Sequence, residues 1–133
     1  MDVIKIEIPS LNENIRIIES FIDNAKDRFK LNDDIYGNIM IAVTESVNNA
    51  IKHGNASNPK KNVLLSMGLN EDTLKVEVED EGPGFDYENL PDPTAPENID
   101  KPSGRGIFLM KQLADEVHFK NNGTLVELYF FMD

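Results

Sequence analysis

The fold of this chain is decided by the stretch TLKVEVEDEGPGFD, residues 73–86. Across residues 74–79, apolar side chains occupy the even positions and charged side chains occupy the odd positions. This two-residue period is typical of a β-strand with one buried face. The same period carries Asp80 onto the buried face, and the turn glycines Gly82 and Gly84 follow at once. The stretch therefore predicts a strand that leads an acid toward the interior.

Asp80 has two interpretations on this segment alone. Burying an unpaired carboxylate is costly, so an inward Asp80 needs hydrogen-bond donors from the backbone or from a ligand. Alternatively, the strand ends at Glu79 and Asp80 caps the glycine turn, which is a common use of Asp-x-Gly sequences. The first interpretation makes Asp80 a candidate binding residue, and the second makes it structural.

The residues before this stretch predict two further strands and two helices. The strands are expected at residues 3–8 and 62–69. The first helix is expected to end at about Phe29, and the second to span about Asp34 to His53. Each helix carries an apolar stripe with helical spacing, and each strand alternates with a period of two. We expect Ser10 or Asn12 to cap the first helix and Asn32 or Asp33 to cap the second.

The residues after the stretch predict a long loop, a helix and a hairpin. Residues 81–103 contain five of the seven prolines and few apolar residues, so we expect a loop with one helical turn. Loops of this length inside compact domains are usually functional or mobile. A helix is expected at 104–114, and strands at 116–121 and 124–131 are joined by Asn-Gly, a strong hairpin signal.

This order of elements predicts the fold class. Helices occur in one run and hairpins in others, which favours an α+β fold: a two-layer sandwich with helices on one face of a mixed sheet. A doubly wound parallel fold fits poorly. The length of 133 residues is that of one ordinary domain, so we expect a single domain over residues 1–133.

The composition excludes several kinds of function. The chain has no cysteine, which rules out disulfides, thiolate metal sites and thiol nucleophiles. Its formal net charge of -11 disfavours nucleic acid and anionic membranes as partners. Residues 1–10 lack the features of a signal peptide, and no apolar run is long enough to span a membrane. We therefore expect a soluble, cytoplasmic protein.

Two more groups of residues carry candidate chemistry. On the helix over residues 34–53, Glu45 and Asn49 lie one turn apart, away from the apolar stripe. This pair is either a solvated helix face or, if covered by the long loop, a proton acceptor beside a cation ligand. Gly104 and Gly106 lie at the start of the helix expected at residues 104–114, where free N–H groups can bind an anion. The alternative for this second group is a flexible loop end with an exposed Arg105.

Taken together and in this order, the three groups resemble the N, G1 and G2 boxes of the GHKL ATPase superfamily, which has the Bergerat ATP-binding fold. The run GRGIFLMKQLADEV, residues 104–117, and the short length resemble the anti-sigma factor serine kinases of bacterial partner-switching systems. The resemblance covers essentially the whole chain.

The resemblance implies a role for residues at the base of the nucleotide. Asp80 would accept a hydrogen bond from the adenine amino group, and Gly82 and Gly84 would form the turn beside the purine. Asn49 would be the amide ligand of Mg²⁺, whose other ligands would be phosphate oxygens and water.

The resemblance also implies roles at the phosphates. Gly104 and Gly106 would lie against them, and Arg105 would contact the γ-phosphate. Residues 87–103 would form the ATP lid. Glu45 would be the general base for a substrate serine hydroxyl.

The function implied is an ATP-dependent protein-serine kinase that phosphorylates an anti-sigma factor antagonist and otherwise sequesters a sigma factor. The alternative is a nucleotide-dependent switch module with little transfer activity; Glu45 in an intact box favours the kinase. The catalytic domain of a sensor histidine kinase would need a phosphoacceptor histidine, and neither His53 nor His118 lies in a suitable helix pair. The subfamily commonly forms homodimers, for which the edges of the first and last strands are candidate surfaces.

Overall fold

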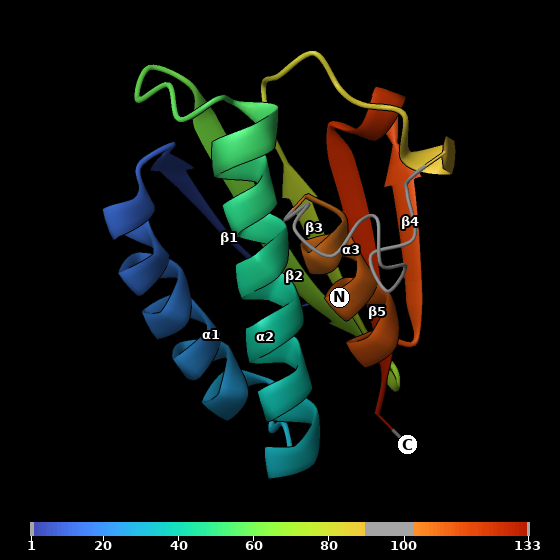
Figure 1. Ribbon diagram of the computed structural model, residues 1–133. Helices are drawn as coiled ribbons and strands as arrows, with labels where there is room; N and C mark the ends of the chain where they lie inside the picture. The colour runs from blue at the N-terminus through green and yellow to red at the C-terminus, as the bar shows by residue number, and fades with distance from the viewer. Residues whose placement is uncertain (1, 90–102, 133) are drawn as a thin grey trace.

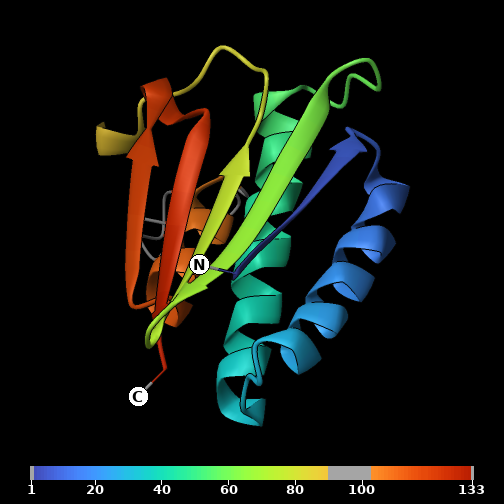
Figure 2. The ribbon, with the colours of Figure 1, turned by 180° about the vertical axis from the view of Figure 1, so that it is seen from behind.

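The computed structural model of the chain describes residues 2–89 and 103–132. In this part, five strands form one sheet in the order β1-β2-β3-β5-β4, and three α-helices lie on one of its faces (Figures 1 and 2). The strands are β1 (Asp2–Pro9), β2 (Asn62–Asn70), β3 (Thr73–Glu79), β4 (Glu116–Lys120) and β5 (Leu125–Phe131). The helices are α1 (Ile15–Arg28), α2 (Asp33–Asn49) and α3 (Ser103–Leu113). The predicted two-layer α+β class is confirmed.

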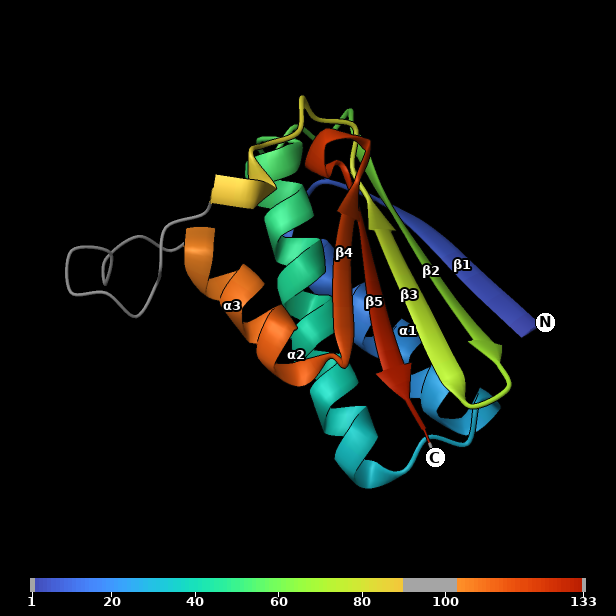
Figure 3. The ribbon, with the colours of Figure 1, turned by 90° about the vertical axis from the view of Figure 1, so that its right-hand side faces the viewer.

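The sheet is antiparallel throughout rather than mixed as expected. All four neighbouring pairs of strands are antiparallel. β3 and β4 run in the same direction, but β5 lies between them and pairs with both. Strands of equal direction therefore never become neighbours, although the chain crosses over through α3 between them (Figure 3).

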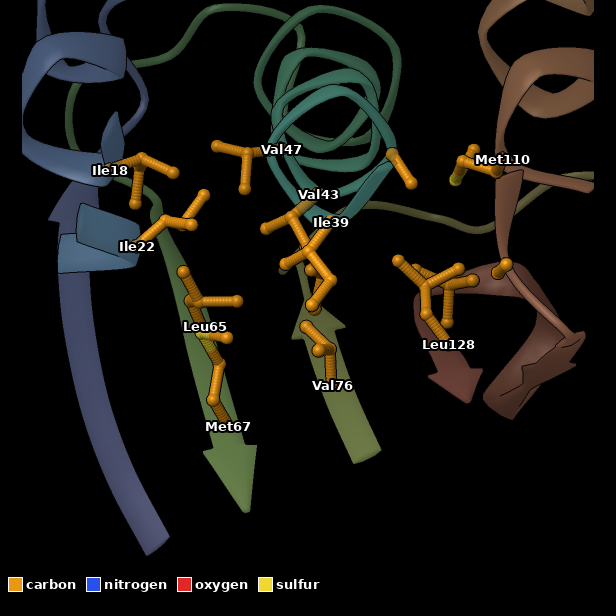
Figure 4. Close-up of a cluster of buried hydrophobic side chains, with 14 of the residues drawn as sticks. Ile18, Ile22, Ile39, Val43, Val47, Leu65, Met67, Val76, Met110 and Leu128 are labelled. Atoms are coloured by element: carbon orange, nitrogen blue, oxygen red, sulfur yellow. The ribbon is translucent and has the colours of Figure 1, made fainter. Parts of the chain in front are cut away.

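The core fills the space between the two layers. Figure 4 shows Ile18 and Ile22 of α1 and Val43 of α2 facing the sheet residues Leu65 and Val76, and all five are fully buried. Helical spacing on one side and alternation on the other thus put both apolar faces against each other. Met110 of α3 closes the core on the side of β5.

The helix caps are correct for the second helix and wrong for the first. Asn32 Oδ1 accepts a hydrogen bond from the backbone N–H of Ile35 at 2.9 Å, as expected of an N-cap. Neither Ser10 nor Asn12 caps α1, which follows a 3-10 turn at residues 12–14. Ser10 is instead fully buried, and its hydroxyl donates to the carbonyl of Lys61 at 2.7 Å. The hydrogen bond to Lys61, which is distant in the sequence, replaces the predicted capping role of Ser10.

The end of α2 is wider than a normal α-helix. Ala50–Gly54 form a π-helical turn, η2, which continues directly from Asn49. Such turns are rare and occur often at functional sites. The turn lies at the end of the molecule where β3 ends and β5 begins (Figure 3).

Two expectations about surfaces can be compared with the structure. The sheet edges are β1 and β4, so the last strand, β5, offers no edge and the predicted dimer surface there is wrong. Across residues 2–89 and 103–132, no helix is both long enough and apolar enough to cross a membrane.

Candidate functional site

A cavity of about 390 Å³ lies between the end of α2, α3 and the facing ends of β3 and β5. Its size is in the range of small-molecule sites, about 300–1,000 Å³. The walls are mainly apolar and include Ala50, Val78, Ile107, Met110 and Val126. Three of the predicted site residues, Asn49, Asp80 and Gly84, line this one cavity.

Asp80 lies at one end of the cavity and caps the turn that follows β3. β3 ends at Glu79, and Asp80 Oδ1 accepts a hydrogen bond from the Gly82 N–H at 2.8 Å. The residue is therefore a turn cap, yet it also lines the cavity. Burial raises the pKa of Asp80, and the hydrogen bond from Gly82 only partly offsets that rise. Within the described residues one donor, the Gly82 N–H, contacts this carboxyl, so it has capacity left for a ligand donor.

Glycine is required where the end of α2 meets the turn after β3. A Cβ built on Gly82 would lie 1.8 Å from the backbone oxygen of Gly54, so no side chain fits there. Gly54 in turn lies against the Asp80 carboxylate. These contacts bring the helix end, the acid and the glycine turn into one unit.

At the other end of the cavity, the start of α3 covers the acid-amide pair of α2. A Cβ built on Gly106 would lie 2.8 Å from Asn49 Nδ2 and 3.2 Å from Glu45 Oε2. Glu45 and Asn49 are thus not on a solvated helix face. α3 covers them, whereas residues 90–102 of the predicted loop and lid lie outside the described residues.

Two buried polar atoms next to the cavity have no hydrogen-bond partner within the described part of the chain: Ser46 Oγ and Asn49 Nδ2. Both residues line the cavity and come from the same side of α2. Buried polar groups in proteins are nearly always satisfied, so an exception calls for an explanation. A polar ligand in the cavity would supply the missing partners.

The described residues suit a metal ion only if it arrives with a ligand. Among them, no group of three or more His, Cys, Asp or Glu side chains is arranged to hold a metal. Mg²⁺ is commonly bound through one or two protein groups together with phosphate oxygens and water. Asn49 lines the cavity, and its carboxamide oxygen is the type of group that such a site uses as a single protein ligand.

The remaining predicted residues are less directly placed. Arg105 is exposed on the first turn of α3 and does not line the cavity. Glu45 is partly exposed and lies beside the cavity rather than on its wall. Gly104 lies in the first turn of α3, as the predicted helix start requires.

Sequence reasoning missed residues that other segments bring to the cavity. Phe85 packs edge-to-face on Phe119, with ring centroids 5.4 Å apart, and both line the wall. The Phe85 N–H donates to the carbonyl of Asn122 at 2.8 Å, and Gly123 packs on the Phe85 ring. The Asn-Gly pair predicts a hairpin turn, but the contact of this turn with Phe85 joins residues far apart in the sequence. Thr124 was missed for the same reason; its carbonyl accepts from the Asp80 N–H at 2.9 Å.

Comparisons with known proteins find relatives that match nearly the whole chain. The sequence model of the histidine kinase-like ATPase domain matches residues 8–130. The chain is 30% identical over 135 residues to the serine-protein kinase RsbW of Staphylococcus aureus strains JH9 and Newman; the match covers 96% of this chain and 85% of those proteins.

A solved structure shares the fold. It contains the RsbU and RsbW domains of Rv1364c from Mycobacterium tuberculosis and superposes with a TM-score of 0.72 at 17% identity. The match covers 98% of this chain and 32% of that longer chain.

Proposed function

The chain belongs to the histidine kinase-like ATPase family, and from that membership we propose that it is an ATP-dependent protein-serine kinase. Its substrate would be an anti-sigma factor antagonist, and its second partner a sigma factor that it holds while the antagonist is unavailable. The observation that supports the proposal best is that Asp80 and Asn49 line the same cavity. One ligand that needs both an acid and an amide there is a purine nucleotide with its phosphates.

The base would lie at the Asp80 end of the cavity. The carboxylate of Asp80 would accept a hydrogen bond from the adenine amino group, and because the acceptor is ionised this bond would be stronger than one between two neutral groups. Gly82 and Gly84 would let the backbone approach the ring. The apolar walls, including Ile107 and Met110, would contact the faces of the purine.

The phosphates would lie at the start of α3. The free N–H groups of Gly104 and Gly106 and the positive end of the helix dipole would favour them in an otherwise acidic protein. Asn49 would hold Mg²⁺, which neutralises charge on the phosphates. Arg105, exposed beside Gly106, would contact the γ-phosphate from the solvent side.

Glu45 is proposed as the general base. The serine oxygen of the substrate would form a bond to the γ-phosphorus while its proton passes to the Glu45 carboxylate. The bond between the γ-phosphorus and the bridging oxygen would break, which releases ADP and leaves phosphoserine on the substrate. The contact between Gly106 and both Glu45 and Asn49 supports this assignment, because it brings base, amide and helix start together.

The test is phosphate transfer from labelled ATP to purified antagonist proteins encoded beside related kinases. The wild-type protein should label a serine. Glu45→Gln keeps the size of the side chain but accepts no proton, so this variant should bind ATP normally and transfer at least about a hundredfold more slowly.

Asn38→Ala is the matched control, since Asn38 is exposed on the same helix and far from the cavity. It should leave binding and transfer unchanged. If the wild-type protein binds ATP and labels none of the antagonists, the kinase proposal is wrong and a nucleotide-dependent binding module replaces it.

A further inference from the structure

A closed ring of hydrogen bonds lies beside the Asp80 end of the cavity. The Glu81 N–H donates to Asn55 Oδ1 at 2.7 Å, and the Asn62 N–H donates to Glu81 Oε2 at 2.5 Å. Asn55 Nδ2 closes the ring by donating to the carbonyl of Asn62 at 3.0 Å. Each of the three residues both donates and accepts, so the ring holds the three segments in one arrangement.

Asn55 is the buried member of this ring. Only 1% of its surface is exposed, whereas Glu81 is exposed. Its Nδ2 donates a second hydrogen bond, at 2.8 Å, to the hydroxyl of the fully buried Ser10. Both donors and the acceptor of the carboxamide are therefore used, and its orientation follows from its partners. One side chain thereby connects the end of β1, the π-helical turn, the start of β2 and the turn after β3.

The position of Asn55 in the chain links this ring to the candidate site. Asn55 follows Gly54 directly, and Glu81 follows Asp80 directly. The hydrogen bond between Asn55 and Glu81 therefore holds together the two backbone segments whose contact places the Asp80 carboxylate. None of the ring residues lines the cavity itself.

We propose that Asn55 is a positioning residue for base recognition: it holds the Asp80–Gly82 turn where the carboxylate can accept from the amino group of a purine. The identity of the ligand rests on the proposed function, whereas the ring does not. A small displacement of a recognition group is enough to weaken a directional contact, because hydrogen bonds decline steeply with misalignment. Losing Asn55 should therefore affect recognition of the amino group more than binding of the phosphates.

The experiment compares ATP with the purine ribonucleoside triphosphate that lacks the 6-amino group. The wild-type protein should bind ATP about tenfold or more tightly than this analogue, the value of a hydrogen bond to a charged acceptor. In Asn55→Ala the ratio of the two affinities should fall toward one, mainly through weaker ATP binding. Asn55→Ser, which keeps a polar group but cannot span the three partners, should show the same loss if Asn55→Ala does not fold.

Two control variants separate positioning from stability. Ser10→Ala removes a buried partner of Asn55 but leaves the bond to Glu81, so it should destabilise the protein and keep the affinity ratio. Asn58→Ala removes the side chain that caps Lys60 N–H in the same loop and should change neither property. Hydrogen exchange in the protein without nucleotide gives a second readout: the Glu81 amide should lose protection in the Asn55 variants alone.

The outcomes distinguish this inference from the function on which it rests. If the wild-type protein binds both nucleotides equally, the proposed contact between Asp80 and adenine is wrong, and the positioning role is wrong with it. If the wild-type protein prefers ATP and the Asn55 variants keep that preference, only the positioning role is overturned. Unchanged exchange of the Glu81 amide in those variants would overturn it as well.

Discussion

The α-carbon of Gly54 lies so close to the carboxylate of Asp80 that only a hydrogen atom fits between them. A Cβ built on Gly54 would lie 2.4 Å from both Cγ and Oδ2 of Asp80. The two residues come from different layers, the π-helical end of α2 and the turn after β3. This contact places the carboxylate at its end of the cavity.

Gly54→Ala should displace the Asp80 carboxylate. Overpacking at this contact is expected to destabilise the fold by about 1–3 kcal/mol and to weaken ATP binding by about tenfold. Thermal unfolding and titration with ATP measure the two effects. Gly37→Ala is the control, because a Cβ on Gly37 meets nothing within 4 Å. That variant should gain about 0.5–1 kcal/mol from helix propensity and bind ATP normally. Equal behaviour of the two variants would contradict the contact.

Ser46→Ala should stabilise the protein without nucleotide and weaken nucleotide binding. The Ser46 hydroxyl is buried without a partner in the described structure, so its removal should gain about 1 kcal/mol. A ligand that satisfies this hydroxyl would lose about fivefold in affinity. Ser20→Ala, on the exposed face of α1, is the control: it should gain less stability than Ser46→Ala and keep the nucleotide affinity of the wild-type protein. Tighter ATP binding by Ser46→Ala would argue against a polar contact there.

ATP binding should weaken in mild acid because of Asp80. Burial raises the pKa of this carboxyl, so protonation begins above the usual pH range of aspartic acid. A protonated Asp80 is a poor acceptor for a hydrogen bond from the adenine amino group, so the affinity for ATP should fall as the pH drops through the raised pKa. Affinity measured by calorimetry from neutral to mildly acidic pH tests this expectation.

Asp80→Asn tests the same group through stability. An acid whose folded-state pKa is raised favours folding when protonated and loses that contribution as the pH rises through the folded-state pKa. The variant should therefore be more stable than the wild-type protein at neutral pH. Its ATP affinity should be lower, and it should lack the fall in mild acid that is expected of the wild-type protein. Asp72→Asn, in the exposed turn at the other end of β3, should leave both properties unchanged.

Glu127 should make the fold sensitive to acid. This residue of β5 is 3% exposed and pairs with Lys75 and Lys120 at 3.2 and 3.0 Å. Burial by itself would raise the pKa of Glu127, but hydrogen bonds from Lys120 and Lys75 outweigh it and leave the pKa below its usual value. Its stabilising contribution is therefore present above the unfolded-state pKa and is lost as the pH falls through the lower folded-state pKa.

Glu127→Gln should remove this acid-dependent contribution. Because both lysines are partly solvent-exposed, the expected cost at neutral pH is modest, about 1–2 kcal/mol. Between neutral and acidic pH, the free energy of unfolding of this variant should then fall less than that of the wild-type protein. Glu116→Gln removes an exposed partner of His118 and serves as the control with little effect. An unchanged acid dependence in Glu127→Gln would show that other groups are responsible.

Periodicity predicted most of the fold. The alternation in β2 and β3 and the stripes of α1 and α2 depend on local side-chain spacing, which is why their buried faces could be expected without coordinates. The same approach was wrong for Ser10, where a carbonyl far along the chain competes with the local cap. The expectation of a mixed sheet was also wrong, because the direction of neighbouring strands depends on which strand lies between which, and every neighbouring pair is antiparallel.

For the candidate site, residue spacing alone was enough to predict the chemical groups and their local placement: an acid after a strand, an amide and an acid one helical turn apart, and glycines at a helix start. These follow from spacing within single elements. Three features could be seen only in the folded molecule: α3 covers Glu45 and Asn49, Gly54 lies against Asp80, and Asn55 connects four segments. The reason is physical: such contacts join residues far apart in the chain, and their geometry exists only after the helical layer packs on the sheet.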